Sequence, residues 1–167
     1  MISPELLRRY PFFSGLSHDQ IVALAQVAQE TIVDTGHYFF HEGEELTCLC
    51  LVVEGAVATV IEVPDQQVKQ QVSDQLTGEL KTSDVVVSAI GPGEVFGWSS
   101  LVPPHQATTS AKATTPCRLV TFNSKDLLKL FEDDCRFGYL MMQKMAQLVR
   151  GRLRDMRIES LAHLVNV

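Results

Sequence analysis

The sequence predicts an α+β fold: an antiparallel β-roll, a jelly-roll-like double-stranded β-helix, flanked by N-terminal helices and a long C-terminal helix. Two observations predict it. Across residues 31–123, short apolar segments alternate with glycine-containing turns, which is typical of antiparallel strands. On both sides of this region, apolar residues recur at helical spacing. We expect one domain over residues 1–167, with N-terminal helices in 1–30, the β-roll in 31–123 and C-terminal helices in 124–165.

Two helices are predicted before the roll. Ser3-Pro4 is typical of a helix start, because proline is favoured at the first helical position. A second helix is predicted to begin at Ser17, which forms a capping box with Gln20. The apolar residues that follow share one helix face, so we expect them in the core: Ile21, Leu24, Ala25 and Ala28.

One stretch interrupts the strand pattern. Residues 64–83 are polar and rich in glutamine, as expected for the tip of a long exposed hairpin. Two interpretations stay open: a loop without a function of its own, or a loop that docks a partner.

Helical spacing returns near the C-terminus. Ser124 is expected to cap a short helix, and a long helix is expected from about Asp134. Part of the long helix's apolar stripe should pack on the roll, and the rest is available to a second copy of the chain. The stripe consists of Phe137, Met141, Met145, Leu148, Leu153, Met156 and Leu161.

Charge argues against nucleic-acid binding. The chain has 20 acidic and 14 basic residues, a net charge of −6, whereas non-specific nucleic-acid binding needs positive charge to displace counterions. Arg150, Arg154 and Arg157 share a helix face, which is either a DNA-contacting face or, as neighbouring acidic residues favour, a solvated flank. Because the sequence shows no signal peptide and no run of about 18 apolar residues, we expect a cytoplasmic protein without membrane contact.

The sequence offers no catalytic or metal-binding pattern. Cys48 and Cys50 are two apart, which is not the spacing of a zinc site. The four cysteines, which include Cys117 and Cys135, are either free buried thiols or redox or iron–sulfur ligands. Neither a nucleophile elbow nor a Walker sequence occurs. We therefore expect no enzyme, no catalytic residues and no metal, and keep an enzyme on a related β-roll as an alternative.

The run from Ile90 to Leu101, IGPGEVFGWSSL, carries the most functional information. It predicts the end of a strand, a tight turn and a short helix that begins after Gly97. Helix N-termini present unpaired N–H groups and partial positive charge, and a glycine permits close approach of an anion. The run is therefore either a phosphate pocket or a purely structural turn.

Together with two upstream runs, GHYFFHEGE at 36–44 and CLCLVVEGAV at 48–57, this stretch resembles the cyclic-nucleotide-binding domain family. That family comprises the β-roll modules of catabolite-activator-type regulators, cyclic-nucleotide-dependent kinases and gated channels. The resemblance implies a regulatory sensor domain whose phosphate-binding cassette begins at Phe96-Gly97. The glycines that carry it are Gly36, Gly43, Gly55, Gly93 and Gly97.

Two ligand-holding positions depart from the family pattern. Where members that bind cyclic AMP or cyclic GMP have a glutamate accepting from the ribose 2′-hydroxyl, this chain has Trp98, which only donates. Where they have an arginine paired with the cyclic phosphate, this chain has Ala107. No other side chain supplies the planar fork of a guanidinium. The resemblance therefore implies a cassette without its usual Glu and Arg, with altered or weak ligand binding.

We expect the ligand site at the cassette and the loop after it. The ligand is expected to be a cyclic nucleotide or another small anionic molecule. The alternative is that Trp98 fills the emptied site and the degenerate roll serves as a dimerisation or protein-docking module. The candidate ligand-binding residues are Phe96, Gly97, Trp98, Ser99, Ser100, Leu101, His105, Gln106, Ala107 and Thr108.

The resemblance also implies a homodimer through the C-terminal helix, with Met145, Leu148 and Met156 in its seam. No DNA-binding helix-turn-helix follows this helix before Val167. We therefore expect either a stand-alone sensor or the sensor half of a longer protein, without direct nucleic-acid binding.

Overall fold

A computed structural model describes residues 2–64 and 82–165. The first half contains α1 (Pro4–Arg8), the 3₁₀ helix η1 (Pro11–Phe13), α2 (His18–Val27), β1 (Ala28–Val33), β2 (Tyr38–Phe40), β3 (Cys48–Glu54) and β4 (Val57–Pro64). The second half contains β5 (Thr82–Ile90), β6 (Val95–Phe96), the 3₁₀ helix η2 (Trp98–Leu101), β7 (Ser110–Ala113), β8 (Cys117–Asn123), α4 (Ser124–Asp133) and α5 (Cys135–Val165).

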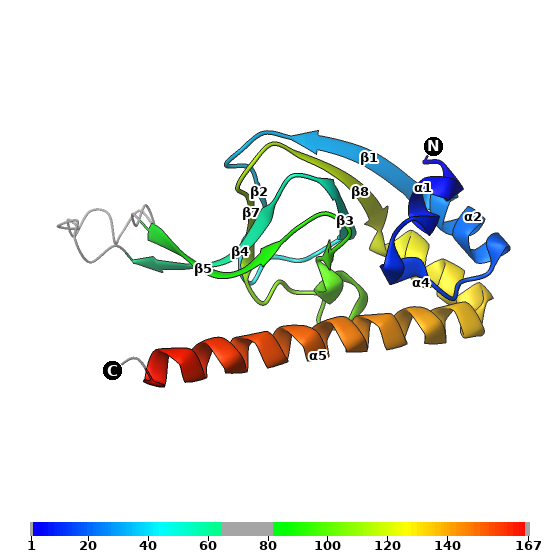
Figure 1. Cartoon of the computed structure of the whole chain (residues 1–167). Coiled ribbons are helices and arrows are strands. Elements are labelled where there is room, and N and C mark those ends of the chain that lie inside the picture. Colours follow the sequence, from blue (N-terminus) through cyan, green and yellow to red (C-terminus); the bar gives the residue numbers. More distant parts are fainter. Residues whose placement is uncertain (1, 65–81, 166–167) are drawn as a thin grey trace.

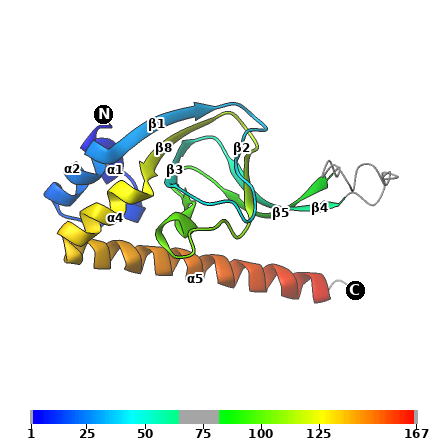
Figure 2. The same ribbon diagram turned by 180° about the vertical axis from the view of Figure 1, so that it is seen from behind.

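The strands form two four-stranded antiparallel sheets, ordered β1-β8-β3-β6 and β2-β7-β4-β5. Figure 1 shows α1, α2 and α4 gathered at one end of the roll, while α5 runs along one side of it. The view from behind shows the same arrangement, with the C-terminal end of α5 and the β4–β5 hairpin extending in the same direction (Figure 2). The predicted α+β fold with an antiparallel β-roll is confirmed.

The predicted capping box on α2 is confirmed. The Ser17 hydroxyl accepts from the Gln20 N–H, and the Gln20 side chain accepts from the Ser17 N–H. Ile21, Leu24 and Ala25 are buried as expected. Ala28 is also buried, but it is the first residue of β1 and not part of the helix. The first strand therefore begins three residues before the expected start at residue 31.

The predicted N-cap of α4, Ser124, is wrong. The Asn123 side chain accepts from the Lys125 N–H at 2.9 Å, while Ser124 is the first helical residue and is buried. Both side chains are good caps, so sequence could not separate them. The start of α5 is fixed similarly: Asp134 Oδ1 accepts from the Phe137 N–H at 3.0 Å.

Two hydrophobic clusters build the core. One joins the helices to the outside of the β1-β8-β3-β6 sheet and includes Leu24, Leu49, Phe122, Phe137 and Met141. The other fills the inside of the roll and includes Val52, Val57, Ile90, Phe96 and Leu119. Burial of this apolar surface is the main favourable contribution to folding.

Strands β4 and β5 pair along their full length, from Val57 with Ile90 to Pro64 with Thr82. The ends of the polar stretch expected as a loop are therefore strand residues. Its interior, 65–81, lies outside the described residues, and so does the expected hairpin tip.

The long helix divides its apolar stripe in two. Phe137, Met141 and Met145 are buried against the chain's own core, whereas Leu153 and Leu161 are 48% and 61% exposed. Met145 cannot therefore lie in a seam between two copies, and this part of the expected seam is wrong. Among the described residues, no helix combines the length and the apolar character needed to cross a membrane.

Gly55 is required by both its conformation and its surroundings. Its φ is +91°, and a Cβ there would lie 2.3 Å from the Pro116 carbonyl oxygen and 2.8 Å from Cys117 Sγ. Gly36 has a similar φ of +87° but open space around its Cβ position. The two glycines separate the cost of the left-handed conformation from the cost of a clash.

We expect Gly36→Ala to lower the free energy of unfolding by about 1 kcal/mol, from the left-handed conformation alone. Gly55→Ala should lower it by about 3 kcal/mol or more, because the carbonyl of Pro116 must also move. Urea denaturation followed by circular dichroism measures both. Equal losses for the two variants would contradict the close packing at Gly55.

Candidate functional site

A cavity of about 150 Å³ lies between the β-roll and α5. Its walls come from both sheets, the segment after β6, the loop before β7 and one face of the long helix. The residues that line it are Phe40, Leu46, Thr59, Val87, Ser88, Ile90, Val95, Phe96, Gly97, Trp98, Ser99, Ala107, Thr108, Thr109, Leu148, Arg152, Asp155, Met156 and Glu159.

Gly97 positions one wall of the cavity. β6 pairs with β3, and the chain then turns at Gly97, whose φ is +78°. A Cβ at this position would lie 2.7 Å from the Cys48 carbonyl oxygen, so only glycine lets the turn pack on β3. η2 starts at the next residue, and the Ser100 N–H donates to the Gly97 carbonyl oxygen at 3.0 Å.

The structure brings six of the ten candidate residues into the cavity wall. These are Phe96, Gly97, Trp98, Ser99, Ala107 and Thr108. Ala107 is buried, and Trp98 is half-buried. Trp98 also packs against the helix-side core and leaves the cavity open beside it.

The other four candidates do not line the cavity. Ser100 and Leu101 are buried in η2, and among the described residues the Ser100 hydroxyl has no hydrogen-bond partner. His105 Nδ1 donates to the Ser100 carbonyl oxygen at 2.9 Å. Gln106 forms an isolated antiparallel bridge with Glu45. These four residues shape the loop that carries Ala107 and Thr108.

Sequence reasoning missed the wall supplied by α5. Leu148, Arg152, Asp155, Met156 and Glu159 recur at intervals of three or four residues, so they share one helix face. That spacing is the signal that could have identified them, once the helix was known to lie over the roll. Thr59 and Ser88, opposite one another on β4 and β5, were also missed.

The cation in the cavity wall is already engaged. Arg152 Nη1 donates to the Ala89 carbonyl oxygen, and its Nη2 lies at the Glu94 carboxylate, both at 3.4 Å. Asp155 and Glu159 lie on the same wall. With one arginine, one aspartate and one glutamate, the lining carries a formal charge of −1.

The cysteines are unpaired thiols in three different environments. Cys50 and Cys117 are buried, Cys48 is half-buried and Cys135 is exposed. Burial raises the pKa of the Cys50 thiol, which keeps it protonated and unreactive. Within residues 2–64 and 82–165, no group of three or more His, Cys, Asp or Glu could hold a metal ion.

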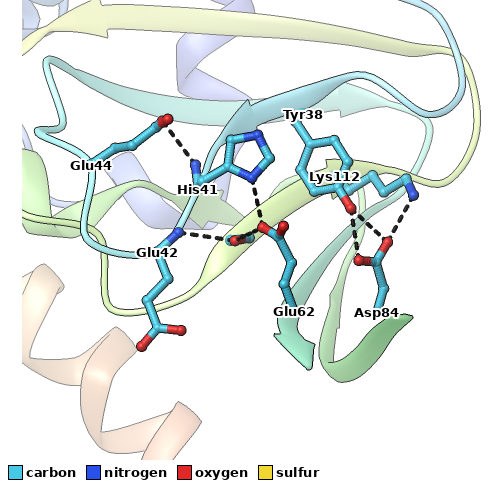
Figure 3. Close-up of polar contacts among 8 residues, drawn as sticks. Tyr38, His41, Glu42, Glu44, Glu62, Asp84 and Lys112 are labelled. Atoms are coloured by element: carbon cyan, nitrogen blue, oxygen red, sulfur yellow. Dashed lines mark hydrogen bonds and ion pairs between the residues drawn. The ribbon is translucent and has the colours of Figure 1, made fainter. Parts of the chain in front are cut away.

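A second polar cluster lies on the β2-β7-β4-β5 sheet, outside the cavity (Figure 3). The Tyr38 hydroxyl donates to both Asp84 oxygens at 2.8 and 2.7 Å, and Lys112 Nζ donates to Asp84 Oδ2 at 2.8 Å. The Tyr38 ring stacks on His41 with 4.5 Å between centroids. Hydrogen bonds to Lys112 and Tyr38 hold the pKa of Asp84 below its usual value.

The cluster also joins a serine, a glutamate and a histidine, but not in the order of a hydrolase triad. Glu62 Oε1 accepts from the Ser110 hydroxyl at 2.5 Å and contacts His41 Nδ1 at 2.6 Å. The carboxylate sits between the other two, so no imidazole can take the serine proton. The Ser110 hydroxyl also accepts from the Glu42 N–H at 2.9 Å. The arrangement ties strands together and activates no nucleophile.

The fold and the cavity define a class of protein: a β-roll domain that encloses a small space between its sheets and a C-terminal helix. The comparison with known proteins makes the class specific. A sequence model of the cyclic nucleotide-binding domain matches residues 30–134. The chain therefore belongs to the cyclic nucleotide-binding domain family.

Individual similar proteins are consistent with this family. The chain is 25% identical over 146 residues to a CRP-like cAMP-activated global transcriptional regulator of Mycobacterium tuberculosis, covering 87% of this chain and 58% of that protein. It is 25% identical over 147 residues to the cGMP-dependent protein kinase egl-4 of Caenorhabditis elegans, of which the match covers 17%. Its structure resembles that of a protein from Geobacter metallireducens GS-15, named as a cyclic nucleotide-binding protein, with a TM-score of 0.73, 33% identity and coverage of 92% and 99% of the two chains.

The polar cluster predicts a pH dependence of stability. Because the pKa of folded Asp84 is depressed, its stabilisation is present above the ordinary carboxyl value of 3.8 and is lost as pH falls through the folded value. Asp84→Asn should lower the free energy of unfolding by about 1 kcal/mol at pH 7. It should lower it by nothing at a pH low enough to protonate the Asp84 carboxyl in both the folded and the unfolded chain. Urea denaturation at a series of pH values measures this.

Glu5→Gln is the matched control. Glu5 pairs with Arg8 at the surface at 3.4 Å with 71% of its side chain exposed, so the variant should change stability by less than about 0.5 kcal/mol at every pH. A pH-independent loss in Asp84→Asn would contradict the ionic role of the Asp84 carboxylate.

Proposed function

We propose that the chain is a non-enzymatic sensor domain of the cyclic-nucleotide-binding type in which ligand choice is altered and cyclic AMP binds weakly. The observation that carries the proposal is the position of Ala107. It is buried in the wall of the same cavity that Gly97 lines, at the position where the family pattern has its phosphate-binding arginine. A methyl group there offers a phosphate no donor and no charge.

Two further features support weak binding of a cyclic nucleotide. Arg152, the arginine in the cavity wall, is bonded to Glu94 and Ala89 and comes from α5, not from the cassette. Trp98 stands where the family pattern has the ribose-binding glutamate, and its indole has no acceptor atom. The phosphate and ribose contacts are thus both without their usual partners.

We expect calorimetric titration of the wild type with cyclic AMP to give a dissociation constant well above micromolar. The variant Trp98→Glu/Ala107→Arg should bind cyclic AMP at least about 30-fold more tightly, because a charge-assisted phosphate pair contributes about 2–3 kcal/mol.

Val102→Arg is the matched control for added charge. Val102 is 40% exposed and lies outside the cavity wall, so its arginine should leave the affinity unchanged. Sub-micromolar binding by the wild type, or an equal gain in the control, would contradict the proposal.

A dimerisation role is the second candidate, and the exposed half of α5 favours it. Leu153, Met156, Ile158 and Leu161 are each about half or more exposed on this half of the helix. These exposed apolar residues suit contact with a second copy of the chain, and the exposed Arg150, Arg154 and Arg157 lie among them on the helix surface. This seam lies further along α5 than the sequence predicted.

We expect the wild type to sediment as a dimer at tens of micromolar and Leu153→Glu/Leu161→Glu to sediment as a monomer. The two carboxylates would replace apolar surface in the seam and would lose hydration on association. Tyr139→Glu, an exposed position on the other half of α5, is the control and should remain dimeric. A monomeric wild type would overturn this candidate.

A further inference from the structure

We infer that the cavity between the roll and α5 takes a neutral apolar molecule of about one aromatic ring, not a phosphodiester. The inference rests on the proposed function, because it takes this cavity to be the sensor's ligand site. It is carried by the size of the cavity, by the apolar and aromatic residues of its interior wall and by the engagement of its arginine.

The size of the cavity sets the first limit. Its volume is about 150 Å³. Pockets for drug-sized ligands typically measure about 300–1,000 Å³. An apolar cavity of about 150 Å³, by contrast, is known to admit a benzene molecule. A single ring therefore fits inside the cavity, which is partly open to solvent.

The interior wall of the cavity is mostly apolar. Ile90, Val95, Phe96 and Leu46 are all buried in it. The hydroxyls of Thr59 and Ser88, which also line it, bond to each other at 2.8 Å. An entering molecule therefore meets apolar surface and a hydroxyl pair at these positions, and it meets the hydroxyl groups of Ser99, Thr108 and Thr109 elsewhere in the lining.

The aromatic residues provide faces for a ring. Phe40 and Phe96 line the cavity with 6.2 Å between their centroids and an interplanar angle of 37°. Trp98 lines the same space. Aromatic pairs at centroid distances of about 4.5–7 Å are favourable beyond the area they bury. A ring inserted here gains this contribution.

The charges disfavour an anion. Asp155 and Glu159 lie on the α5 wall, and Arg152 beside them is bonded to Glu94. Asp155 and Glu159 are exposed, so water screens their interaction with a ligand charge of either sign. An anion that enters the cavity must give up bound water, and the described residues of the lining offer no unpaired cation to replace it. A neutral ring gives up less hydration on entry.

Three probes with the same ring and different charge test the inference: benzyl alcohol, benzyl phosphate and benzylamine. Trp98 is the single tryptophan, so its emission reports binding at this site on the intact wild-type chain. We expect benzyl alcohol to bind at least about tenfold more tightly than either charged probe, the equivalent of about 1.4 kcal/mol. Tighter or equal binding of benzyl phosphate or benzylamine overturns the inference, and so does the absence of any saturable change.

Two variants locate the binding. Ala107→Phe fills the cavity and should abolish the response to benzyl alcohol, whereas Val102→Phe, outside the cavity wall, should leave it unchanged. Circular dichroism checks that both are folded. If Ala107→Phe does not fold, the smaller substitution Ala107→Leu serves instead, and it should weaken the response to benzyl alcohol. An unchanged response in a folded Ala107→Leu overturns the inference.

The outcome is separable from that of the proposed function. If no ring binds but Trp98→Glu/Ala107→Arg still gains affinity for cyclic AMP in calorimetry, the sensor proposal stands and the neutral-ligand inference fails. If the wild type binds cyclic AMP below micromolar, the sensor proposal itself fails in its claim of altered ligand choice.

Discussion

The packing of Gly97 on the backbone of β3 is the constraint on which the site depends. A φ of +78° and the Cys48 carbonyl oxygen, 2.7 Å from where a Cβ would stand, leave no room for a side chain. This contact sends the chain from β6 directly into η2 and places Trp98 beside the cavity. The glycine is therefore needed for the shape of the cassette whether or not an anion approaches it.

On our proposal, the cassette keeps its backbone while its ligand chemistry changes. The turn, the short helix and the strand pairing are set by main-chain bonds and by glycine, which do not depend on Trp98 or Ala107. Both side chains line the cavity, and we propose that they select the ligand. A family fold can take a different ligand, because function is decided by the residues of the site and not by the fold alone.

Local signals were predictable from the sequence and tertiary ones were not. The turn glycines and the Ser17–Gln20 capping box act within a few residues, so pattern alone identified them. The wall from Arg152 to Glu159 depends on how α5 lies across the roll. The cluster around Asp84 draws on strands β2, β5 and β7, which are far apart in the sequence. For the same reason, helical spacing could not show that Met145 packs on its own core.

The central claim is that this cavity does not hold a phosphate. The most direct test is a competition experiment in which cyclic AMP and adenosine compete for the wild-type chain at equilibrium, because the two ligands differ in the cyclic phosphate alone. With Ala107 in the wall and Arg152 paired with Glu94, the phosphate should add nothing to the affinity. Cyclic AMP should therefore bind no more tightly than adenosine. A preference for cyclic AMP of about tenfold or more would contradict the account.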